Sequence, residues 1–365
     1  MSLLLTTTGS APIPSTERVL GTGDWFFAPN GPAEGVTSRV ALDFPQGAPG
    51  GWRARWPVKA GQTLRARIEG GQTLTFSGQT TATPTSDGHV WSDPISAPVA
   101  AGVTLTLRTC ATGAHAAPAS YDWRSLGWGL GDYYDAPSLP YGTPGPSVRP
   151  DIVVGPSGGP AVLIVGDSII AGSGSYLELA ARDAGVPCYG VGTGGEQTST
   201  FLASIDSKVA GLDYAWWTHV IHQHGINDAD KSGRIACWQW GRSKGLTNIQ
   251  TTILPATSST DGWTTVEGQT PEWFSASASA TNLWLRDGAP ITAGAPAAVG
   301  AVDAIRVGHQ DHPLDAVWDT ATTAYPAGYV DRWRVPGWGG DGVHPSATAH
   351  IGLGLPAAAY METLL

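Results

Sequence analysis

The sequence has few cysteines, few charged residues and no basic run. Charged side chains make up only 14% of the chain, and 20 basic residues face 30 acidic ones, which gives a net charge of −10. The positive surface that neutralises phosphates is therefore missing, and we expect no nucleic acid partner. Three cysteines are too few and too scattered for a disulfide framework, and no pair has the spacing of metal ligands: Cys110, Cys188 and Cys237. We interpret them as small buried hydrophobic residues.

Long apolar runs are also absent. No stretch approaches the roughly 20 residues that span a bilayer, so we expect no membrane contact. Residues 1–8 hold a short apolar stretch without a basic n-region and are not a complete secretory signal. We predict a soluble protein whose composition suits a secreted or surface location, while its cellular address and oligomeric state stay open.

Glycine, proline and tryptophan are abundant instead, with 49, 28 and 16 residues. This composition is typical of short strands joined by turns. Four segments of alternating polarity, separated by Gly and Pro, predict antiparallel strands at 38–44, 52–58, 63–68 and 103–109. We therefore predict an all-β sandwich or jelly-roll domain over residues 1–115. A connection rich in Pro and Gly, residues 116–158, should follow it.

The pattern changes after residue 159. Residues 161–165 are a continuous apolar run, as in a strand of a parallel sheet that is buried on both faces. A helix should begin near Ser175, because apolar residues then recur at helical spacing, and Gly185 is placed to end it. This pattern of an apolar strand followed by an amphipathic helix predicts an α/β domain over residues 159–365.

Further segments extend the α/β pattern. A second helix fits residues 202–209, and apolar strands are expected at 215–221 and 246–254. Strands that alternate with helices predict a parallel sheet with helices on both faces. For residues 257–313 we predict long loops with a short helix near 281–285.

Ser168 is the first candidate for chemistry. It lies three residues beyond the apolar run, in Gly166-Asp167-Ser168-Ile169, and ahead of the predicted helix. The carboxyl edge of a parallel sheet is where such folds bind ligands, and a helix N-terminus favours developing negative charge. Alone, however, Asp-Ser at a strand-to-helix turn is more often a cap than a nucleophile.

The far end of the chain supplies the groups that would activate a serine. Asp341-Gly342-Val343-His344 places a carboxylate and an imidazole three residues apart on a glycine-rich loop before the last helix. Attack on an ester needs an imidazole to take the hydroxyl proton and a carboxylate to orient that imidazole. The alternative is an Asp-Gly turn with an incidental histidine.

Two segments could stabilise an oxyanion. Asn227, in Gly225-Ile226-Asn227-Asp228, follows a predicted strand and could bring its amide to the same sheet edge. In the glycine-rich turn at 190–195, a backbone N–H could approach a ligand without obstruction by a Cβ. That turn does not have the spacing of a dinucleotide fingerprint, and no Lys follows it as in a P-loop, so we expect no nucleotide.

Taken in order, Gly166-Asp167-Ser168, Gly195, Gly225-Ile226-Asn227-Asp228 and Asp341-Gly342-Val343-His344 resemble the four signature blocks of the SGNH hydrolases, also called the GDSL family. The resemblance covers roughly residues 160–355. It implies a three-layer α/β/α fold, hydrolysis of carboxylic esters through an acyl-enzyme, and no cofactor.

Carried over position by position, the resemblance implies Ser168 as nucleophile and first oxyanion donor through its own N–H. It implies backbone donation by Gly195, side-chain donation by Asn227, His344 as general base and Asp341 as the group that orients it. The second block departs from the family pattern, because Thr198 follows Gly195 one residue later than usual, so Gly194 is an alternative donor. The chain also lacks the Gly-x-Ser-x-Gly elbow of ordinary α/β-hydrolases.

Other histidines are weaker candidates. His309, His312 and His350 could replace His344 as the base, but none has a carboxylate at the same spacing. His222 and His224 would share one face of a strand just before Asn227. Because no cysteine or carboxylate pair lies near them along the chain, we expect hydrogen-bonded histidines flanking a pocket rather than a metal site.

The sequence thus predicts a serine ester hydrolase. The favoured reaction is removal of a short acyl group, acetyl first, from a carbohydrate or small ester. The carbohydrate is favoured because Trp and Gly are abundant and Trp can stack on sugars. It is also favoured because the overall layout resembles that of glycan esterases with an N-terminal β-sandwich. The β domain would hold a polymer or pack against the active-site rim. The alternatives are a lipase or general carboxylesterase, an acyltransferase, and a non-catalytic glycan-binding module of a surface or phage-tail type.

Overall fold

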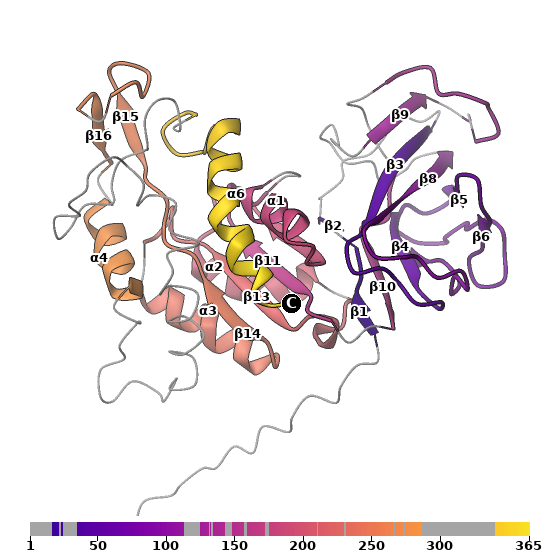
Figure 1. The fold of residues 1–365 in the computed structure, drawn as a ribbon, viewed down its shortest axis with the longest axis horizontal. Coiled ribbons are helices and arrows are strands. Elements are labelled where there is room, and N and C mark those ends of the chain that lie inside the picture. Colours follow the sequence, from indigo (N-terminus) through magenta and orange to yellow (C-terminus); the bar gives the residue numbers. More distant parts are fainter. Residues whose placement is uncertain are drawn as a thin grey trace, which may run out of the picture.

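Two antiparallel sheets form the first half of the chain in a computed structural model of the protein (Figure 1). The structure describes residues 17–21, 23–24, 35–112, 125–130, 132, 134–142, 148–156, 159–171, 175–209, 211–229, 231–265, 267–272, 275–286 and 340–365. One sheet has the order β1 (Glu17–Val19), β10 (Ile152–Pro156), β4 (Arg53–Val58) and β7 (Gly88–Trp91). The other has the order β6 (Thr73–Leu74), β5 (Thr63–Ile68), β8 (Val103–Thr112), β3 (Val36–Phe44) and β9 (Ser125–Leu130). Buried side chains of both sheets form one hydrophobic core, and we call this unit the β-sandwich.

Alternating polarity explains why these segments are strands. In β5, Leu64 and Ala66 are fully buried, whereas Arg65 and Arg67 lie on the opposite, partly exposed face. Burial of one such aliphatic side chain contributes roughly 1.5–3 kcal/mol. The predicted strands agree with β3, β4 and β5 within two residues, and β8 continues three residues beyond its predicted end.

A five-stranded parallel sheet carries the second half of the chain. Its order is β14 (Thr247–Gln250), β13 (His219–Gln223), β11 (Val162–Gly166), β12 (Cys188–Gly192) and β2 (Gly23–Asp24). On one face, Val162 and Ile164 share a core with α1 (Tyr176–Asp183) and α6 (Ala347–Glu362). On the other face, Leu163 and Val165 share a core with α2 (Thr198–Lys208) and α3 (Lys231–Ser243). This three-layer α/β/α arrangement beside antiparallel sheets confirms the predicted fold class.

Local signals set the bounds of α1. The Ser175 hydroxyl accepts from the N–H of Glu178, and the Glu178 carboxylate accepts from the N–H of Ser175, which makes a capping box. Gly185 has a φ of +71°, the left-handed conformation with which helices commonly end. The predicted start and end of this helix are confirmed.

The third parallel strand begins later than predicted. We expected it at 215–221, but Tyr214–Trp216 form a 3₁₀ turn because Asp213 Oδ1 accepts from the N–H of Ala215. The strand β13 therefore starts at His219. Likewise β14 covers four residues of the predicted 246–254.

Residues 257–313 have more regular structure than predicted in their described part. A hairpin forms from β15 (Thr257–Ser259) and β16 (Gln269–Pro271), and α4 (Ser275–Arg286) is longer than the predicted helix at 281–285. No helix within the described ranges combines the length and apolar composition needed to cross a membrane.

The β-sandwich contacts the amino edge of the parallel sheet. The Gln46 amide donates to the carbonyls of Pro160 and Gly185, which precede β11 and β12, at 3.3 and 3.4 Å. Trp91 of β7 packs edge-on against Trp216, which precedes β13, with ring centroids 5.6 Å apart. Ser168 and Asn227 follow the carboxyl ends of β11 and β13, at the opposite edge. These contacts lie at the edge opposite Ser168 and Asn227, and packing of the β domain against the active-site rim stays a prediction.

Two strands cross the domain limits that we propose from the sequence. Within residues 116–158, β10 pairs with both β1 and β4 of the β-sandwich. Within residues 1–115, the short strand β2 pairs with β12 at the edge of the parallel sheet. Each unit thus contains a segment that lies far from it in the sequence.

Candidate active site

Close packing at the ends of β11 and β12 positions Ser168. A Cβ on Gly166 would lie 2.9 Å from the Gln223 carbonyl oxygen, and one on Gly192 would collide with the Ala171 nitrogen, so both positions require glycine. The chain turns directly after Gly166, where the Asp167 carbonyl accepts from the N–H groups of Ile170 and Ala171. The turn leaves Ser168 partly exposed at the carboxyl edge of the sheet.

The loop before α6 brings His344 and Asp341 to this serine. His344 Nε2 lies 2.8 Å from Ser168 Oγ, and His344 Nδ1 lies 2.8 Å from Asp341 Oδ2. Ser168 and His344 are 176 residues apart in the sequence, whereas Asp341 and His344 are 3 residues apart. Their side chains form one continuous series of hydrogen bonds. The imidazole can thus accept the hydroxyl proton at one nitrogen while the carboxylate holds the other N–H.

Asp341 is held as an anion. Partial burial opposes its ionisation, but hydrogen bonds from the backbone and ring of His344 and from the N–H of Val343 outweigh it and lower the pKa of Asp341 to about 2. Its second oxygen, Oδ2, is the one that meets the imidazole. The carboxylate therefore stays charged at neutral pH.

The β15–β16 hairpin supports the 341–344 loop, which the sequence did not reveal. The Thr257 N–H donates to the Gly342 carbonyl at 2.9 Å, and a Cβ on Gly342 would collide with the Thr257 oxygen and lie 3.0 Å from the Trp263 ring. Trp263 has a φ of +60°, which is unfavourable for a bulky residue. Its N–H donates to Ser259 Oγ and its indole N–H to Thr257 Oγ1, at 2.8 and 2.9 Å. The hairpin thus fixes a strained residue directly against the loop.

The turn with Gly194 and Gly195 lies beside Asn227. The Glu196 N–H donates to the Thr193 carbonyl, and of the two glycines only Gly195 has a positive φ, at +70°, as the third position of a type II turn requires. A Cβ on either glycine would have open space around it. The Asn227 amide donates one N–H to the Glu196 carbonyl at 3.1 Å and has a second N–H to offer.

Asp228 ties the same two loops together. Its Oδ2 accepts from the N–H and the hydroxyl of Thr198, at 2.7 and 2.6 Å, at the first residue of α2. A carboxylate at a helix N-terminus is favourable, and here it comes from another loop because Gln197 makes no side-chain cap. Asn227 and Asp228 thereby hold their loop in a fixed position relative to the turn at Gly194 and Gly195.

Asp167 is a buried carboxyl beneath the serine. Burial raises its pKa to about 7, although a hydrogen bond from the Ile169 N–H and the charges of Arg234 and His344 act in the opposite direction. Its Oδ2 has no hydrogen-bond partner among the described residues. From the sequence, a cap was the alternative role for Asp167 or Ser168. The Asp167 Oδ1 atom does accept a hydrogen bond from the Ile169 N–H two residues later, at 3.0 Å.

This buried carboxyl should make the protein less stable as the pH rises. Between the unfolded pKa of about 3.9 and the folded pKa near 7, the native state retains a proton that the unfolded state has lost, so the free energy of unfolding falls across that window. Asp167→Asn removes this titration. We expect the variant to gain roughly 1–4 kcal/mol over wild type between pH 4.5 and pH 8 in urea denaturation. The matched control is Asp183→Asn on the surface of α1, and equal pH dependence in all three proteins would contradict the assignment.

The other described histidines lie away from Ser168 or have partners of their own. His350 Nδ1 accepts from the Tyr176 N–H at 3.1 Å, and burial lowers the pKa of His350 to about 4. His222 Nε2 lies 3.1 Å from Asn248 Oδ1, as expected for a hydrogen-bonded histidine, but neither nitrogen of His224 has a hydrogen-bond partner in the described part of the chain. His309 and His312 lie outside the described residues.

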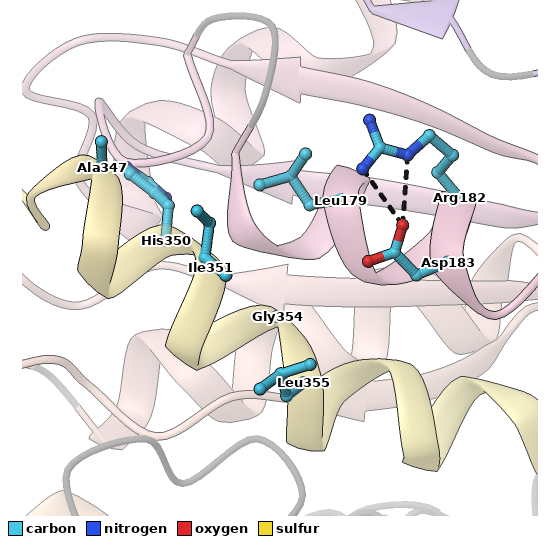
Figure 2. A pocket seen from close by; sticks show the side chains of 8 residues that line it. All are labelled: Leu179, Arg182, Asp183, Ala347, His350, Ile351, Gly354 and Leu355. Carbon is cyan, nitrogen blue, oxygen red and sulfur yellow. Dashed lines mark hydrogen bonds and ion pairs between the residues drawn. The ribbon is translucent and has the colours of Figure 1, made fainter.

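A separate groove of about 540 Å³ runs over the outer faces of α1 and α6 (Figure 2). Its lining mixes apolar Leu179, Ile351 and Leu355 with Arg182, whose guanidinium is bonded to Asp183. Neither Ser168 nor His344 lines it. The groove is therefore not the place where the hydrogen-bonded serine would meet a substrate.

Fold and site together define a three-layer α/β/α protein with a hydrogen-bonded serine, histidine and aspartate at the carboxyl edge of its sheet. No family model matches the chain, and no curated protein matches it. Similar solved structures include a family two carbohydrate esterase from Clostridium thermocellum, which has 11% identity and a TM-score of 0.35 over 95% of this chain and 98% of that one. A peptidoglycan O-acetylesterase has 14% identity and a TM-score of 0.36 over 96% of this chain and 78% of its own.

A lipase/acylhydrolase from Enterococcus faecalis has 17% identity and a TM-score of 0.30, over 56% of this chain and 96% of its own. Other similar structures are a putative lipolytic protein of the G-D-S-L family from Desulfitobacterium hafniense and a putative SGNH hydrolase from Slackia heliotrinireducens. At these identities and TM-scores the likeness does not define the site, which depends on the hydrogen bonds described above.

Proposed function

We propose that this protein is a serine ester hydrolase that acts through an acyl-enzyme. The observation that carries the proposal is the continuous chain from Ser168 Oγ through His344 to Asp341. The serine oxygen attacks the ester carbonyl while His344 Nε2 takes its proton, and the imidazolium then protonates the departing alcohol. Water, deprotonated by the same imidazole, attacks the acyl-serine and releases the carboxylic acid and free serine. No cofactor enters this sequence of steps.

Three donors would stabilise the oxyanion of each tetrahedral intermediate. We assign the Ser168 N–H, the Gly195 N–H and the second N–H of the Asn227 amide to this role. The hydrogen bond from Asn227 to the Glu196 carbonyl supports the assignment, because it holds the amide beside the Gly195 turn. A Cβ added at Gly195 would meet no described atom within 4 Å, so side chains do not crowd that side of the turn.

We propose a short acyl group, acetyl first, carried by a carbohydrate or a small alcohol. The names of the similar carbohydrate esterase and O-acetylesterase guide only the choice of substrates to test. The experiment compares nitrophenyl acetate, butyrate and octanoate and then measures acetate release from acetylated xylan and acetylated peptidoglycan. Faster turnover of acetate than of octanoate, with acetate released from a glycan, is the expected result. A preference for octanoate would instead favour the lipase alternative.

The fit of Gly342 against the hairpin makes a further prediction about activity. In Gly342→Ala the new methyl group would collide with the Thr257 carbonyl, so the 341–344 loop must move. A shift of about 1 Å in a catalytic group can cost 10²-fold, and we expect a comparable fall in kcat/KM for nitrophenyl acetate. The matched control is Gly262→Ala, at a similar positive φ of +69° but in open space. If both variants lose activity equally, backbone strain rather than the collision is responsible.

A further inference from the structure

A second group of chemically reactive side chains lies where α2 and α3 cover one face of the parallel sheet, next to β13. The side chains of His222, His224 and Cys237 converge there, and one possible ligand atom from each lies within 4.8 Å of the other two. All three residues have an exposed fraction of 0%. We propose that they bind a zinc ion, and that this site is structural and separate from the ester chemistry.

The orientation of His222 supports metal binding. Its Nε2 lies 3.1 Å from Asn248 Oδ1, and the Asn248 amide is itself fixed because its Nδ2 donates to the Leu246 carbonyl at 3.0 Å. The Asn248 oxygen can only accept, so the proton of His222 is on Nε2 and the lone pair is on Nδ1. That Nδ1 is buried and has no hydrogen-bond partner among the described residues. Metal-bound histidines have this arrangement, in which one nitrogen donates to an oxygen and the other faces the ion.

His224 and Cys237 complete the set. His224 Nδ1 has no hydrogen-bond partner in the described ranges, and His224 Nε2 has only the Glu196 Oε2 atom near it, at 3.6 Å, which is too long for a hydrogen bond. Burying such atoms without partners is unfavourable, and a shared ion would satisfy them. Two imidazoles with one thiol are soft or borderline ligands, which favour zinc over magnesium or calcium. From the sequence we expected no metal because no cysteine lies near these histidines, but α3 brings Cys237 to them.

Charge and packing are compatible with an ion at this place. A Cys237 thiolate would offset part of the charge of a zinc ion, and the Glu196 carboxylate, which is paired with Lys208, lies beside His224. The Glu196 side chain is already 1% exposed and beside His224. Phe201 and Trp240 cover the histidines, with ring centroids 4.6 Å from His224 and 5.9 Å from His222. Ligands closed off in this way imply that the ion enters during folding.

The experiment measures metal in the full chain, produced in zinc-supplemented medium and freed of any affinity tag. We expect about one zinc per chain by elemental analysis. Production with cobalt in place of zinc should give a thiolate-to-cobalt charge-transfer band. Cys237→Ser and His224→Gln should lose both signals, whereas Cys110→Ser, a buried free cysteine of the β-sandwich, should keep them.

Two results would overturn the proposal. One is wild-type protein without stoichiometric zinc and without the cobalt band. The other is folded Cys237→Ser that retains the ion. If both ligand variants fail to fold, the cobalt spectrum of the wild-type protein is the test. The thiolate-to-cobalt band supports the proposal, and its absence overturns it. These readouts do not involve ester hydrolysis, so they are independent of the proposed function.

Discussion

Ser168→Ala should lower kcat/KM for nitrophenyl acetate by roughly 10⁴- to 10⁶-fold, the range found when a triad nucleophile is removed. The variant loses one oxygen from a partly exposed side chain, and that oxygen is the atom 2.8 Å from His344 Nε2. The core is untouched, so we expect the circular dichroism spectrum to be unchanged and Tm to shift by no more than about 2 °C. Initial rates on wild type and variant at equal concentration measure the effect.

The control for this substitution is Ser207→Ala on the exposed face of α2, whose hydroxyl bonds only the Ser204 carbonyl among the described residues. It should retain full activity. A fluorophosphonate should label wild type at Ser168 and leave Ser168→Ala unlabelled. Label on another serine, or more than about a hundredth of wild-type activity in Ser168→Ala, would show that a different residue attacks the ester.

Local patterns explain what could be predicted from the sequence. The apolar run at 161–165 indicates a strand that is buried on both faces, and the bounds of β11 differ from this run by one residue at each end. Ser175 and Glu178 form a capping box, so the start of α1 is also encoded in adjacent residues. The position of Ser168 between these two elements followed directly, and His344 Nε2 does lie beside its hydroxyl.

Contacts between distant segments explain what could not be predicted. β2 has two residues, too few to show any periodicity, and it is a strand only because β12 offers a free edge. Likewise, nothing in the sequence around Trp263 indicates that its ring packs beside Gly342. Cys237 reaches His222 through the packing of α3 on the sheet, so cysteine spacing along the chain was uninformative. In each case the partner lies far away in the sequence and no local pattern records it.

Asp341→Asn should separate the structural and chemical roles of this carboxylate. Its Oδ1 accepts from the N–H groups of Val343 and His344, and an asparagine oxygen can keep both bonds, so the loop should remain folded. Its Oδ2 faces His344 Nδ1, where an amide NH₂ would favour the wrong tautomer. We expect kcat/KM to fall by roughly 10²- to 10⁴-fold, the upper end being the cost of this change in a serine protease triad.

Because the pKa of Asp341 is near 2, the carboxylate is ionised throughout an assay range of pH 5–9, and the deficit should persist across it. The matched control is Asp183→Asn, an exposed carboxylate bonded to Arg182 on α1, which should leave the rate unchanged. Retention of more than about a tenth of activity by Asp341→Asn would mean that another group orients His344. Loss of activity together with a lower Tm would instead locate the role of Asp341 in holding the loop.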